Sequence, residues 1–103
     1  MSENPRLNRV RVKLIGVLGS AAGRPEIDLE SPKPQTISEL LETLIKTVNN
    51  RQFQDFLMDS GTHDPRPNVI ILLNDQDCNL FNGLRTEVEN GATVVIIPVA
   101  HGG

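Results

Sequence analysis

The sequence predicts an α+β roll in which one main helix packs across one face of a β-sheet. A capping box followed by an apolar stripe predicts a single strong helix over residues 36–48. Alternating apolar and polar residues before this helix, and apolar segments bounded by turns after it, predict the strands. With 103 residues and 38% hydrophobic side chains, the chain can form one domain with an aliphatic core.

The first two strands are expected to form an N-terminal hairpin. Three apolar residues alternate with three basic ones in the first strand, namely Val10, Val12 and Leu14 with Arg9, Arg11 and Lys13. Residues 26–30 alternate again and predict the antiparallel partner, and residues 20–23 are typical of a turn between the two strands. The basic positions are interpreted as the solvated face of the first strand rather than as phosphate contacts, because the chain is acidic overall.

The main helix has a clear beginning and end in the sequence. Thr36 and Glu39 form the capping-box pattern, and Asn49 is expected to follow the last turn. The apolar stripe consists of Ile37, Leu40, Leu41, Leu44, Ile45 and Val48. The spacing within residues 53–57 indicates a short second helix or an irregular turn, and residues 59–67 are typical of a loop.

Three further strands are expected in the second half of the chain. Residues 69–73 are five consecutive apolar residues, as in a strand buried on both faces. Residues 78–81 predict a short edge strand with Cys78 on it, and residues 93–99 predict the last and most apolar strand. The predicted order is therefore strand, strand, helix, short helix and three strands.

Composition excludes several classes of function. The net charge of −3 argues against direct, sequence-independent binding to nucleic acid. One cysteine cannot form an internal disulfide, and no segment approaches the roughly 20 apolar residues of a membrane span. No apolar N-terminal stretch resembles a signal peptide. We expect a soluble, cytoplasmic domain that does not bind membranes.

No motif predicts a metal site or an enzyme active site. Residues 75–79 hint at a calcium loop, but Leu80 stands where that loop needs glycine and Thr86 where it needs glutamate. The two histidines and the cysteine, which are His63, Cys78 and His101, lack the spacing of zinc ligands. No nucleophile is paired with a base. We therefore expect a protein that has no catalytic residues, metal or bound cofactor.

The most informative segment is the end of the chain. Gly102 and Gly103 close the sequence directly after its most apolar strand, and a terminal glycine pair arises by chance in about one chain in 200. Glycine has no Cβ, so a tail over residues 100–103, attached to a domain over residues 1–99, can pass through a narrow channel. The carboxylate is a poor acyl donor until it is activated, which indicates adenylation by a partner enzyme.

The order of elements and the terminal glycines together resemble the β-grasp, ubiquitin-like sulfur carriers. This family includes the ubiquitin-related modifier, the small subunit of molybdopterin synthase and the thiazole-pathway carrier, and the likeness is greatest to the ubiquitin-related modifier. The segments that carry it are Arg66-Pro67, Ile71-Leu72-Leu73-Asn74-Asp75-x-Asp77, Gly83-Leu84 and His101-Gly102-Gly103. The resemblance implies a mixed sheet with one helix across it.

The resemblance also implies a mechanism. An E1-like enzyme would use ATP to adenylate Gly103, and a sulfur donor would convert it to a thiocarboxylate, with Gly102 and His101 as the tail that enters the enzyme. The acceptor would be a tRNA thiolase or the large subunit of molybdopterin synthase, and conjugation to lysines of target proteins is a further outcome. ATP and the sulfur donor are used by the partner, so the carrier itself holds neither.

The docking surface is expected on the last strand, where Val95, Ile97 and Val99 share one side and Val94 and Ile96 the other. We assign the first set to partner binding, because it leads to the terminal glycines, and expect a monomer in the absence of the partner. The alternative is a non-covalent β-grasp adaptor in which the two glycines have no role. A third and weaker interpretation is a domain that binds a small ligand or RNA.

Overall fold

The computed structural model describes residues 7–58, 61–62 and 64–99. Its elements are β1 (Asn8–Leu14), α1 (Val17–Ala22), β2 (Glu26–Ser31), β3 (Gln35–Thr36), α2 (Ile37–Val48), α3 (Arg51–Leu57), β4 (Val69–Leu73), β5 (Gln76–Asp77), the 3₁₀ turns η1 (Cys78–Leu80) and η2 (Gly83–Arg85), β6 (Glu87–Val88) and β7 (Thr93–Pro98).

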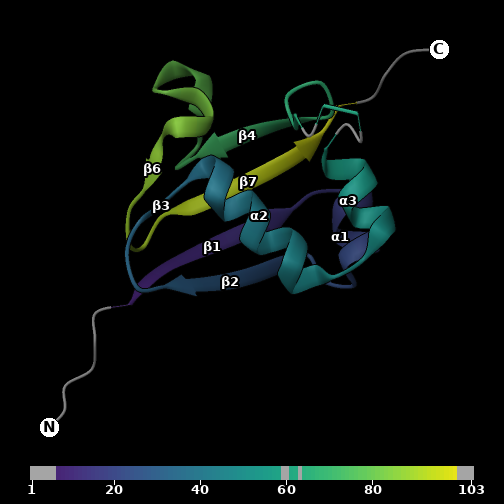
Figure 1. Ribbon diagram of the computed structural model, residues 1–103, viewed down its shortest axis with the longest axis horizontal. Helices are drawn as coiled ribbons and strands as arrows, with labels where there is room; N and C mark the ends of the chain where they lie inside the picture. The colour runs from purple at the N-terminus through teal and green to yellow at the C-terminus, as the bar shows by residue number, and fades with distance from the viewer. Residues whose placement is uncertain (1–6, 59–60, 63, 100–103) are drawn as a thin grey trace, which may run out of the picture.

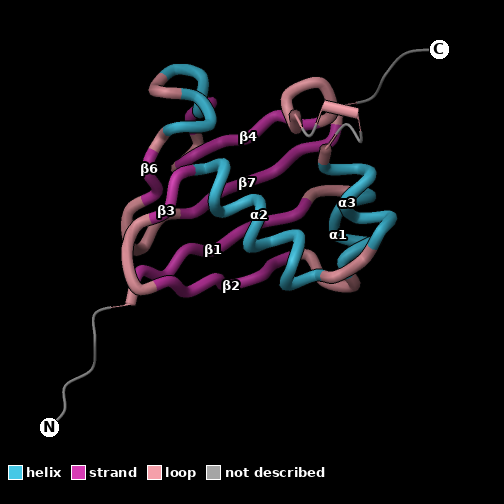
Figure 2. The backbone as a smooth tube through the Cα atoms, viewed as in Figure 1, coloured by secondary structure: helices cyan, strands magenta, loops and turns pink. Residues whose placement is uncertain are grey.

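The main sheet has five strands in the order β2-β1-β7-β4-β5 (Figure 1). The two central strands, β1 and β7, run parallel, and each of the other pairs is antiparallel. Strands β3 and β6 form a separate antiparallel pair. The mixed sheet with a helix across it confirms the predicted fold class, because α2 crosses in front of β1 and β7 (Figure 2).

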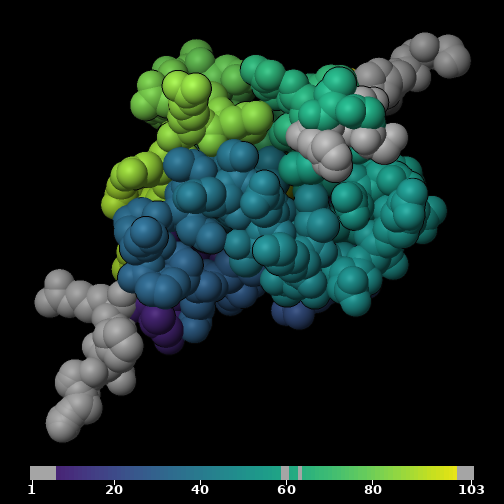
Figure 3. Space-filling model, viewed as in Figure 1, coloured from purple at the N-terminus to yellow at the C-terminus, as the bar shows by residue number. Residues whose placement is uncertain are grey.

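Helix α2 begins and ends where the sequence predicts. The Glu39 amide donates to Thr36 Oγ1 at 3.1 Å, and the Thr36 amide donates to Glu39 Oε1 at 2.9 Å, which completes the capping box. Asn49 ends the helix in the left-handed conformation. Four residues of the apolar stripe are fully buried: Ile37, Leu40, Leu41 and Leu44. Helices and loops cover this side of the sheet (Figure 3), so the stripe packs into the core.

The predicted pairing of the first two strands is confirmed, but the connection between them differs from the prediction. Residues 17–22 form helix α1, where a turn was predicted over residues 20–23, and Gly23 ends the helix with a φ of 80°. The sequence did not predict this helix because Gly19 lies within it, and glycine disfavours helices. At Gly19, however, a Cβ would lie 2.8 Å from the Leu14 carbonyl oxygen, so close packing of the helix against β1 requires glycine there.

Residues 53–57, for which the sequence left a short helix or an irregular turn open, lie in helix α3. The Asn50 side chain accepts a hydrogen bond from the Phe53 amide at 2.9 Å and so caps the helix. Phe53 and Leu57 are fully buried beside α1. None of the helices in the described part of the chain has the length and apolar character needed to cross a membrane.

The prediction that residues 69–73 are buried on both faces is wrong. Val69, Ile71 and Leu73 are buried, but Ile70 is 43% exposed and Leu72 is half-buried. Helix α2 covers one side of the sheet (Figure 1), and none of the described helices lies over the other side of β4. The apolar run therefore marks an open face rather than a doubly covered strand.

The predicted edge strand over residues 78–81 is also wrong. After the turn, Gln76 and Asp77 pair with β4, and the chain then enters η1 instead of continuing as a strand. Asn74 and Asp75 take positive φ angles of 49° and 71° and reverse the chain, and Asp77 accepts from the Asn79 amide at 2.9 Å. The aspartates that resembled a calcium loop therefore build a turn, and Cys78 begins a 3₁₀ turn with its side chain buried.

Candidate functional site

The alternation of β7 separates core residues from surface residues of the same type. Val94 and Ile96 are fully buried, whereas Val95 and Ile97 are half-buried. Since adjacent side chains of a strand point to opposite faces, the second pair lies on the face turned away from α2. We call this face the outer face of the sheet.

Aliphatic side chains from three neighbouring strands gather on the outer face. Register places Ile70 opposite Ile97 and Leu72 opposite Val95 across the β4–β7 pair. Ile15, which continues the alternation of β1, is 42% exposed, and its amide donates to the Ile96 carbonyl oxygen at 3.1 Å. We call these five residues, Ile15, Ile70, Leu72, Val95 and Ile97, the apolar face. Such a cluster is typical of a docking surface.

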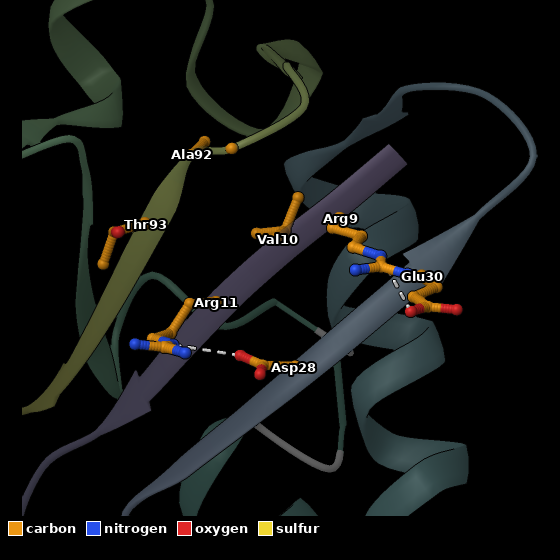
Figure 4. Close-up of a pocket in the computed structure, with 8 residues that line it drawn as sticks. Arg9, Val10, Arg11, Asp28, Glu30, Ala92 and Thr93 are labelled. Carbon is orange, nitrogen blue, oxygen red and sulfur yellow. Dashed lines mark hydrogen bonds and ion pairs between the residues drawn. The ribbon is translucent and has the colours of Figure 1, made fainter. Parts of the chain in front are cut away.

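The other half of the outer face is charged. Arg9 pairs with Glu30 at 3.0 Å, and Arg11 pairs with Asp28 at 3.0 Å (Figure 4). These ion pairs border a shallow groove of about 380 Å³ between β2, β1 and the start of β7. Arg9 and Arg11 therefore lie on a solvated face, as predicted, and the acidic residues of β2 neutralise these two cations.

Two carboxyl groups, of the exposed Asp28 and the half-buried Asp64, are held by arginine. The hydrogen bond from Arg11 lowers the pKa of Asp28, although partial desolvation acts in the opposite direction. Hydrogen bonds from the side chain and the backbone amide of Arg66 lower the pKa of Asp64 to about 2. Both groups are therefore ionised near neutral pH, and neither has the raised pKa of a general acid.

Cys78 does not have the surroundings of a reactive thiol. Its side chain is buried, and burial raises the pKa of the thiol, to which the charge of Asp77 adds. Among the described residues, no group of three or more His, Cys, Asp or Glu side chains lies close enough to hold a metal ion.

The structure brings Val95 and Ile97 together on the outer face, and Val99 follows them with 36% of its surface exposed. Their role in partner binding stays a prediction. His101, Gly102 and Gly103 lie outside the described residues. Sequence reasoning missed three members of the apolar face, Ile15, Ile70 and Leu72. Continuing the alternation of β1 by one step would have found Ile15.

A mixed five-stranded β-grasp sheet, crossed by one helix and apolar on its open face, defines a ubiquitin-like protein. Comparison with protein families agrees, because the family model described as "ThiS family" matches residues 12–103. The match covers most of the chain, so the chain belongs to the ThiS family, one of the families of ubiquitin-like sulfur carriers and modifiers.

Individual relatives support this assignment. The chain is 30% identical over 80 residues to the ubiquitin-related modifier 1 homolog of Drosophila simulans, covering 78% of this chain and 76% of that protein. It resembles the solution structure of Urm1 from Trypanosoma brucei with a TM-score of 0.74 and 26% identity over the whole of both chains. The small archaeal modifier protein 1 of Methanosarcina acetivorans has the same fold, with a TM-score of 0.79 at 23% identity, over 95% of this chain and 99% of the other.

Proposed function

We propose that this chain is a sulfur carrier whose Gly103 carboxylate is activated by an E1-like adenylating enzyme. A carboxylate oxygen attacks the α-phosphate of ATP, and pyrophosphate leaves. The terminal sulfur of a cysteine persulfide then attacks the acyl carbon, and AMP leaves. A thiol cleaves the resulting S–S bond, forms a disulfide with the cysteine sulfur and releases the thiocarboxylate.

The observation that supports this proposal best is the apolar face, together with membership of the family. The apolar face includes Val95 and Ile97 of β7, and in the sequence residues 100–103 follow that strand and Val99. A partner that covers Val95 and Ile97 is therefore also placed near the start of the tail. The carrier supplies the acyl group and the docking surface, and the partner supplies the catalytic groups.

The thiocarboxylate would donate sulfur for tRNA thiolation or for molybdopterin synthesis. The acceptor would be a tRNA thiolase in the first case and the large subunit of molybdopterin synthase in the second. Attack of a target lysine amine on the activated acyl carbon would instead form an isopeptide bond.

The test is the intact mass of the full-length chain after incubation with the E1-like enzyme of its host, ATP and a persulfide donor. Exchange of one carboxylate oxygen for sulfur adds about 16 Da, as expected for nucleophilic substitution at an activated acyl group. Deletion of Gly103 should abolish the shift, because the carboxylate would then lie up to about 3.6 Å short of the nucleotide. Gly102→Val should impair it, because a branched side chain would enter the channel.

The same experiment examines the competing function. A non-covalent adaptor would bind its partner through the apolar face without any change in mass at the C-terminus. If the wild-type chain shows no ATP-dependent change with any E1-like enzyme of its host, the adaptor replaces the carrier.

A further inference from the structure

The three cations of β1 on the outer face differ in their partners. Arg9 pairs with Glu30 at 3.0 Å. Arg11 pairs with Asp28 at 3.0 Å and also lies 3.7 Å from Glu26. Lys13 makes no ion pair and no side-chain hydrogen bond with any residue that the structure describes. The first two cations are thus neutralised within the sheet, and the third is not.

The reason lies in the register of the strands. Glu26 is the cross-strand neighbour of Lys13 on β2, but its carboxylate lies toward Arg11. Arg11 therefore interacts with two carboxylates, those of Glu26 and Asp28. On its other side, the cross-strand neighbour of Lys13 is Val95 of β7. Lys13 therefore lies at the boundary between the charged half of the outer face and the apolar face, and it is half-buried there.

A partner that covers Val95 removes water from around Lys13 as well. A desolvated ammonium group without a counter-charge opposes binding, whereas a carboxylate on the partner would satisfy it. A lysine beside an apolar centre thus favours partners with an acidic residue at one position and disfavours wholly apolar or basic ones. The other charged side chains of β1 and β2 pair with one another, so Lys13 is the charge of these two strands that remains to be satisfied.

We propose that Lys13 selects the activating enzyme by pairing with a carboxylate at the edge of an apolar patch on that enzyme. The inference rests on the proposed function, because it concerns the partner of the same surface. It specifies the chemistry of that partner: an apolar area to cover Val95 and Ile97, and an aspartate or glutamate facing β1.

The experiment compares variants of the full-length carrier as substrates of the host E1-like enzyme, with ATP-dependent pyrophosphate release as the readout. Lys13→Glu should raise the KM for the carrier by about tenfold or more and leave kcat nearly unchanged, because opposed charges weaken encounter and docking. Lys13→Met should raise the KM less, and the KM of Lys13→Arg should stay near the wild-type value. The matched control is Lys33→Glu, which makes the same charge change in the exposed loop before β3.

Salt provides a second measurement. The KM of the wild-type carrier should rise with ionic strength more steeply than that of Lys13→Met, since only the first has the ion pair to screen. Thermal unfolding of each variant shows whether the fold is intact, and Lys13→Met decides the case if Lys13→Glu does not fold.

The outcomes separate the two proposals. If wild type is adenylated but Lys13→Glu and Lys13→Met match it in KM, the role of Lys13 is overturned and the carrier function stands. The same holds if Lys33→Glu raises KM as much as Lys13→Glu, since net charge alone would then explain the effect. If wild type is not adenylated at all, the carrier function fails, and this role of Lys13 fails with it.

Discussion

Strand β7 contains two pairs of similar aliphatic residues with different environments. Val94 and Ile96 are fully buried between the sheet and α2, whereas Val95 and Ile97 share the outer face with Ile70. Composition does not distinguish the pairs, since each has one valine and one isoleucine. The inner pair contributes to stability through burial, and the outer pair is available to a partner. One strand thus carries both the fold and the candidate binding surface.

The largest expected effect is the loss of stability when a residue on the buried side of β7 is truncated. Ile96→Ala should lower the free energy of unfolding by about 2–5 kcal/mol, because it leaves a cavity in the core. Ile97→Ala, the matched variant one residue later, should lower it by less than about 1.5 kcal/mol, because its side chain is already partly in water. Urea unfolding measures both. Equal losses would show that the two faces of β7 are not different in burial.

A charge on the outer side should affect binding rather than folding. Ile97→Asp should weaken binding to the E1-like partner by about 2 kcal/mol, which is roughly 30-fold, because a carboxylate would be desolvated at the centre of the interface. Calorimetric titration measures the affinity. Leu80→Asp is the control, because Leu80 is 73% exposed on η1, outside the apolar face. Unfolding of Ile97→Asp would contradict the assignment of this residue to the open face.

Helix α2 covers the inner face of the sheet, and the stability of the protein should depend on the cap of this helix. Thr36→Ala should lower the free energy of unfolding by about 1 kcal/mol, because the Glu39 amide loses its hydrogen bond to Oγ1. Thr47→Ala removes a hydroxyl from the same helix, where it only donates to the Thr43 carbonyl oxygen, and should cost much less. Equal stabilities of the two variants would show that the capping box contributes nothing.

The smallest effect concerns a charge that is not part of β7. The folded pKa of Asp64 lies at about 2, below its usual value of 3.8, because of Arg66. A lowered folded pKa stabilises the fold above the unfolded value, and this contribution is lost as pH falls from about 4 to about 2. Asp64→Asn should therefore flatten the pH dependence of stability in that range. An NMR titration of the Asp64 carboxyl with a midpoint near 3.8 would contradict this.

Local patterns were enough to predict the main elements. The capping box, the apolar stripe of α2 and the alternation of β1 each depend on residues a few positions apart, and the structure confirms all three. Helix α1 was missed because Gly19, inside it, opposes helix formation locally. Packing of Gly19 against the Leu14 carbonyl oxygen, a contact between two elements, outweighs that preference.

The sequence by itself determined the two sides of β7, because a strand alternates whatever packs on it. It did not determine that β4 has an open side, since five apolar residues are equally typical of a strand covered twice. Only the tertiary structure decided this, by placing α2 on one face of the sheet and none of the helices described on the other. The position of Lys13 was decided in the same way, because Val95 and Glu26 become its neighbours only through the register of β7 and β2 with β1.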